Sequence, residues 1–204
     1  MAYYIRVLSP DTNPVSALAI RTAFSANELP ALLSGDDEGA AWQQLSVAHP
    51  DGRPVCLIER NAVTETGLGR EEIDEFEEEV RNCLPKSAAL WLGSYLPSVQ
   101  TIYAIQILQG ACDSGGWDIV DTIKNVIWNA SGGIIQADSE GFSNEDGYHI
   151  LWQFSDDATG DWWMAVPTTE GGWLKFRMDV GNPAHRAACL KGEIPPGVEI
   201  VDQV

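Results

Sequence analysis

The stretch that decides the fold covers residues 101–154, TIYAIQILQGACDSGGWDIVDTIKNVIWNASGGIIQADSEGFSNEDGYHILWQF. Its opening part, residues 102–108, is apolar and rich in β-branched side chains, which predicts a buried strand. Because this strand has few polar positions, we expect both of its faces to be covered. Residues 115–130 follow as an amphipathic helix, since apolar side chains recur there every three or four residues.

The ends of this helix carry their own signals. Asp113 or Ser114 is the expected N-cap, because short polar side chains accept hydrogen bonds from the first free amides of a helix. Gly132 and Gly133 are expected to end the helix, since glycine readily adopts the left-handed conformation found just past a helix.

A hairpin is expected after the helix. Residues 134–137 are apolar and predict one strand, and residues 148–154 alternate and predict its partner, with Asp146-Gly147 favouring a turn between them. The unit that results is a strand, a helix and a hairpin, in which the helix covers one face of a sheet.

The rest of the chain repeats the same kinds of element. Helices are expected at residues 15–24, 70–84, 87–96 and 183–190, strands at 3–8 and 198–201, hairpins at 42–60 and 161–178, and a loop at 36–39. Together these predict an α+β protein built from antiparallel hairpins with helices packed on one face. We expect one continuous domain over residues 1–204. An alternative is a pseudo-repeat of halves 1–99 and 100–204, each a split β-α-β unit of ferredoxin-like type.

Charge is the strongest compositional signal. The 204 residues carry a formal net charge of -18, distributed as -8 over residues 1–99 and -10 over residues 100–204. A field of this sign repels nucleic acid and anionic membranes and favours cationic partners. The competing interpretation is that the charge only keeps the protein soluble.

The helix expected at residues 70–84 concentrates this charge. One stripe of it is apolar, formed by Ile73, Phe76, Val80 and Leu84. The other positions are almost all acidic, and we take Glu71, Glu75 and Glu78 as candidate binding residues for a basic protein. The alternative is a solvated outer face with no partner.

Aromatic and histidine residues give a second candidate site. Six of the eight tryptophans lie between Trp117 and Trp173. An exposed Trp152 or Trp162 beside carboxylates could stack on a ligand, although tryptophans more often fill a core. His149, with Glu140 or Asp138 opposite it on a paired strand, is the acid–base candidate.

Other chemistry has no support in the sequence. The four cysteines, Cys56, Cys83, Cys112 and Cys189, are far apart and form no C-x-x-C pair, so we expect neither a metal site nor a redox pair. The glycines match neither a phosphate-binding loop nor a dinucleotide fingerprint, so no cofactor is expected. A Cys–His pair assembled by the fold stays open as an alternative.

Targeting signals are weak as well. The first residues lack the apolar segment of a signal peptide, and no run approaches the ~20 apolar residues that cross a bilayer. A cytoplasmic protein with reduced thiols is therefore expected, without membrane association.

The functional prediction is a non-enzymatic, regulatory domain that binds a basic protein partner. One alternative is a small-molecule-binding protein or enzyme with an aromatic-and-acid pocket around Trp152, Trp162, Glu140 and His149. Another is a homo-oligomer that forms by pairing of exposed hairpin edges.

Overall fold

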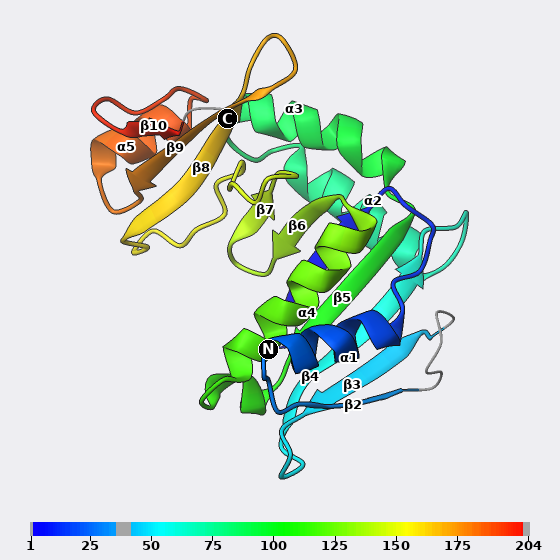
Figure 1. Cartoon of the computed structure of the whole chain (residues 1–204). Coiled ribbons are helices and arrows are strands. Elements are labelled where there is room, and N and C mark those ends of the chain that lie inside the picture. The colour runs from blue at the N-terminus through cyan, green and yellow to red at the C-terminus, as the bar shows by residue number, and fades with distance from the viewer. Residues whose placement is uncertain (1, 36–41, 202–204) are drawn as a thin grey trace. The chain divides into compact units, whose positions relative to one another are not determined.

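The computed structural model describes residues 2–35 and 42–201, which form an α+β arrangement of helices and antiparallel strands (Figure 1). The predicted fold class is confirmed at this level. The loop expected at residues 36–39 lies outside the described residues.

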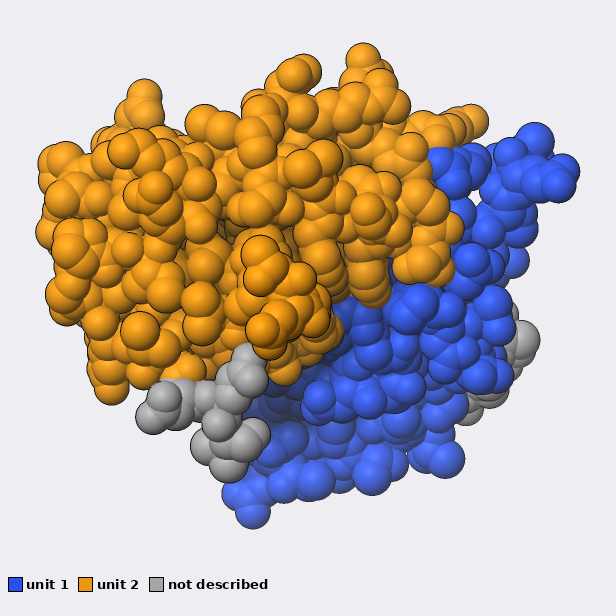
Figure 2. Space-filling model, turned by 90° about the horizontal axis from the view of Figure 1, so that it is seen from above, with its two compact units in different colours: residues 1–70, 99–133 blue, residues 71–98, 134–204 orange. Residues whose placement is uncertain are grey.

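The chain divides into two compact units (Figure 2). Unit 1 holds residues 1–70 and 99–133, and unit 2 holds residues 71–98 and 134–204. Each unit therefore combines segments from both halves of the sequence. The single continuous domain and the repeated halves stay predictions.

Unit 1 contains an antiparallel sheet in the order β2-β3-β4-β5-β1. Its elements are β1 (Tyr3–Ser9), α1 (Ala17–Ala26), β2 (Leu32–Gly35), β3 (Gln44–Ala48), β4 (Pro54–Ala62), β5 (Thr101–Ile107) and α4 (Gly116–Ser131), with a 3-10 turn at Gln109–Cys112. β5 lies between β4 and β1, and its first five residues are buried, which confirms the predicted interior strand. The strand order does not confirm a ferredoxin-like duplication.

Two buried aromatic side chains of unit 1 hold the loop between β1 and α1. The Val15 amide donates to the Tyr103 hydroxyl at 3.2 Å, and the Trp42 indole Nε1 donates to the Val15 carbonyl at 2.7 Å. Both rings are completely buried, and their centroids lie 6.0 Å apart. The loop backbone thus finds its hydrogen bonds inside the unit, as buried peptide groups require.

Unit 2 contains a three-stranded sheet in the order β10-β9-β8 and the antiparallel strand pair β6 and β7. Its elements are α2 (Leu68–Val80, which starts in unit 1), α3 (Lys86–Tyr95), β6 (Ile134–Ala137), β7 (Gly141–Ser143), β8 (Asp161–Pro167), β9 (Trp173–Asp179), α5 (Pro183–Cys189) and β10 (Glu199–Val201), with a 3-10 turn at Leu96–Ser98.

The partner of β6 differs from the prediction. The chain turns back at once, and β6 pairs with β7 at residues 141–143. The expected partner, residues 148–154, forms no strand: His149 makes only isolated bridges, to Ser143 and to Met164. This pairing is possible because Ser139 and Gly141 both adopt positive φ, 64° and 96°, so the three residues between Ala137 and Gly141 reverse the chain.

Two predicted helix details are wrong. α2 ends at Val80, so Leu84 leaves the apolar stripe and is 39% exposed; Pro85 follows it, and a residue before proline disfavours helical backbone. The N-cap of α4 is Gly115 with φ 76°, rather than Asp113 or Ser114. The predicted stop at Gly132 is confirmed, with φ 65° and its amide on the Trp128 carbonyl.

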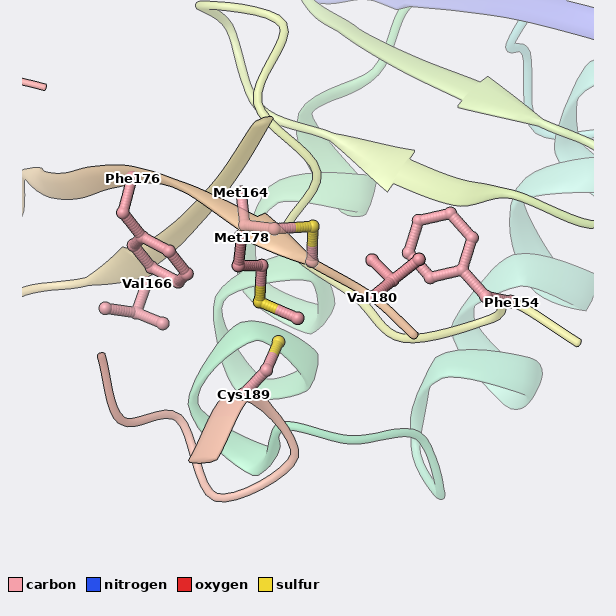
Figure 3. Close-up of a cluster of buried hydrophobic side chains, with 7 residues drawn as sticks. All are labelled: Phe154, Met164, Val166, Phe176, Met178, Val180 and Cys189. Carbon is pink, nitrogen blue, oxygen red and sulfur yellow. The ribbon is translucent and has the colours of Figure 1, made fainter. Parts of the chain in front are cut away.

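The three-stranded sheet of unit 2 covers its own apolar cluster (Figure 3). The cluster consists of Phe154, Met164, Val166, Phe176, Met178, Val180 and Cys189. Phe176 and Met178 are buried and alternate with the exposed Arg177 and Asp179 of β9.

Removal of the Phe176 ring is expected to lower the free energy of unfolding by about 3–5 kcal/mol, because the ring is fully buried and leaves a cavity. Phe176→Ala and the control Leu174→Ala, at a position that is 42% exposed, are compared by urea unfolding. The control should lose no more than about 1 kcal/mol. Equal losses in the two variants would contradict the assigned core.

Candidate functional site

The acidic side chains of α2 form an outward stripe. Glu71, Glu75 and Glu78 are spaced by four and three residues, and all three are exposed. At about 100° per residue they lie opposite the buried side chains Ile73 and Val80. We call Glu71, Glu75 and Glu78 the acidic stripe.

The carboxylates of the acidic stripe are not neutralised by ion pairs with other described residues. Among the described residues, no ion pair joins Glu71, Glu75 or Glu78 to a lysine or arginine. The helix itself is anchored on its other face, where the Phe76 ring meets Phe142 edge-on at 5.5 Å between centroids. The stripe is thus a charged surface on a fixed support.

The predicted aromatic site is partly assembled. His149 and Trp162 lie 4.7 Å apart between ring centroids, and Phe154 joins Trp162 at 4.6 Å and Trp152 at 5.1 Å. Both tryptophans are partly buried and pack against the apolar cluster of unit 2. Arg186 covers the Trp152 ring at 5.0 Å. The rings therefore extend the core toward the surface.

The surroundings of His149 favour its neutral form. Burial lowers the pKa of His149 to about 4 from its ordinary 6.5, because a charged imidazolium loses solvation among these rings. Its Nδ1 lies 3.3 Å from the Ser143 hydroxyl. The residue opposite His149 is Ser143, and the expectation of Asp138 or Glu140 at that place is wrong.

Glu140 and Asp138 lie instead in the turn between β6 and β7. The Glu140 amide donates to the Ala137 carbonyl at 3.1 Å. Asp138 lines a polar pocket of about 500 Å³ within unit 2. The other lining residues are Phe76, Glu79, Gln136, Ser139 and Gln153, and the Gln153 amide donates to the Glu79 carboxylate. Such a lining of carboxylates and amides suits a small cationic or hydroxylated ligand.

The most exposed aromatic residue of this region is Trp163, whereas the sequence analysis named its neighbour Trp162. Trp163 is 48% exposed, with the Arg177 guanidinium 5.7 Å from its centroid and Tyr148 edge-on at 6.0 Å. Adjacent strand residues face opposite ways, and here Trp162 packs on the apolar cluster while Trp163 points outward.

The cysteines offer no ready nucleophile in the interior. All four are free, and burial raises the pKa of Cys56 to about 12 and that of Cys189 to about 11. Thiols with such pKa values stay protonated at neutral pH and react slowly.

Across residues 2–35 and 42–201, no three His, Cys, Asp or Glu side chains are grouped so that they could hold a metal ion. In the same part of the chain, no helix has the length and apolar character needed to span a bilayer.

Comparison of the chain with models of known protein families, with curated proteins and with solved structures found no match.

The burial of His149 predicts a pH dependence of stability. Because the folded pKa lies below the unfolded one, the unfolded chain binds the proton first, so stability is lost as the pH falls from about 6.5 to about 4. A shift of this size corresponds to roughly 3 kcal/mol. His149→Gln should therefore lose less stability over this range than the wild type, measured by guanidinium unfolding at a series of pH values.

The control for this experiment is His185→Gln, which removes a histidine of α5 outside the aromatic cluster. Its pH profile should follow the wild type more closely than that of His149→Gln. Parallel profiles for the wild type and His149→Gln would show that His149 titrates normally.

Proposed function

We propose that this chain is a non-enzymatic, regulatory domain that binds a basic protein partner through the acidic stripe of α2. The observation that carries the proposal is the stripe itself: three exposed carboxylates at helical spacing, with no neutralising cation among the described residues. Charges arranged in this way steer an oppositely charged partner and set its register.

The charge of the whole chain supports the same role. A formal charge of -18 gives a long-range attraction for cationic surfaces, which raises the rate of association at low ionic strength. In this proposal the protein acts in the cytoplasm, where its four free cysteines stay reduced. A homo-oligomer is compatible with it, provided that α2 stays exposed.

The role of the stripe is tested by Glu71→Gln/Glu75→Gln/Glu78→Gln. The wild-type chain is first used to capture partners from the lysate of its native host at low and high salt. A captured basic protein is then purified, and its affinity for the wild type and the variant is measured. We expect the triple variant to bind this protein at least ~10-fold more weakly, because each exposed ion pair contributes up to about 1 kcal/mol.

The matched control carries Glu170→Gln/Glu193→Gln/Glu199→Gln, three exposed acids of unit 2 that lie outside α2. It has the same net charge as the triple variant and should keep most of the affinity. Equal losses would assign the effect to overall charge, and binding that does not weaken as salt rises would rule out the electrostatic mechanism.

The polar pocket beside Asp138 favours a second candidate function, the binding of a small molecule. A thermal-shift screen of small cationic and hydroxylated compounds is expected to give ligands that stabilise the wild type but not Asp138→Asn. Loss of the shift in His149→Ala or Glu140→Ala would instead place the ligand in the aromatic-and-acid pocket. A screen with no stabilising compound would count against both.

A further inference from the structure

A groove of about 440 Å³ runs between α2 and α3 within unit 2. It is lined by Glu77 and Val80 of α2, by Arg81 directly after this helix, and by Lys86, Ala89, Leu90, Gly93 and Ser94 of α3. On each helix these positions are separated by three or four residues, so each helix presents one continuous stripe to the groove. The α3 stripe covers two turns, or about 12 Å.

The groove has an apolar floor. Val80 and Ala89 are buried at its base, whereas Leu90 is 74% exposed. Gly93 leaves open space, because a Cβ atom added there would meet no heavy atom within 4 Å. Leu90 therefore offers apolar surface that another molecule can cover.

Charges surround this floor unevenly. Glu77 lies on the α2 lip, and Glu78 of the acidic stripe follows about 100° further round the helix, within reach of a long basic side chain. The cations of the lining, Arg81 and Lys86, both lie at one end, and the Lys86 Nζ donates to the Arg81 carbonyl at 3.2 Å. The groove thus has an acidic side and a basic end.

We propose that this groove binds an amphipathic helix of the basic partner. Apolar side chains at spacings of three, four and seven contact Leu90, and flanking lysines or arginines pair with Glu77 and Glu78. The C-terminal end of the bound helix points toward Arg81 and Lys86, because this end carries partial negative charge. This inference rests on the proposed function and specifies the form of the partner.

A helix suits the groove better than an extended peptide. Both walls are helices, whose backbone groups already bond within each helix, so an extended segment would find no strand edge to pair with. A helix satisfies its own backbone and needs only the apolar floor and the charged side.

The test uses a labelled 15-residue peptide of leucine and lysine with one apolar helical face. The comparison peptide has the same composition, with its leucines spread round the helix. Fluorescence anisotropy with the full chain should show at least ~10-fold tighter binding of the amphipathic peptide, because only this peptide covers Leu90 while it keeps its lysines near the acids.

Two variants probe the groove without changing its charge. Leu90→Gln removes the apolar contact, and Gly93→Gln fills the open space with a neutral, helix-favouring side chain. Each should weaken binding of the amphipathic peptide at least ~10-fold. Leu18→Gln, at a leucine of α1 that is 67% exposed, is the matched control and should leave affinity unchanged. Thermal unfolding verifies that all three variants are folded.

The outcomes separate the two proposals. Equal affinity for both peptides, no measurable binding, or full affinity in folded Leu90→Gln and Gly93→Gln would overturn the groove. Glu71→Gln/Glu75→Gln/Glu78→Gln weakens both peptides if the acidic stripe binds cations, whether or not the groove is used. A silent triple variant would overturn the proposed function instead.

Discussion

Strand β5 is paired along both edges, and unit 1 is built outward from this pairing. Each of its seven residues has a partner on β1 and another on β4, from Thr101 to Ile107. A slip of one residue on either side would turn every side chain of the slipped strand to the opposite face. The register therefore fixes which side chains are buried, among them Tyr103, which holds the loop before α1 through the Val15 amide.

Unit 2 depends in a similar way on α2, which has one buried apolar face and one exposed acidic face. Seven of its thirteen residues are acidic, and like charges four residues apart destabilise a helix by about 0.2–0.5 kcal/mol per pair. Burial of Ile73, Phe76 and Val80 contributes about 1.5–3 kcal/mol each, which is larger than the repulsion. The apolar face thus allows the outer face to remain strongly charged, and the repulsion is a tolerable cost of the stripe.

Local periodicity explains what the sequence could predict. The interior position of β5 and the helix α4 follow from patterns within single segments. The partner of β6 could not be read in this way, because pairing with residues 141–143 or with 148–154 depends on a turn conformation and on contacts distant in sequence. The candidate site shows the same difference. The spacing of the acidic stripe can be read from one segment of the sequence, whereas the exposure of Trp163 and Leu90 depends on tertiary packing.

The free energies of ion pairing and apolar burial indicate how the acidic stripe and the groove could together hold a partner. An exposed ion pair contributes at most about 1 kcal/mol, so three pairs on the acidic stripe give about 3 kcal/mol, less than the 4.1 kcal/mol of a 1 mM complex. Surface charges alone therefore speed the encounter without retaining the partner. Apolar area covered at about 25 cal/mol per Å² has to supply the rest, and Leu90 in the groove provides such area beside Glu77 of α2. Attraction by the acidic stripe and retention by the groove are thus complementary requirements for binding one partner.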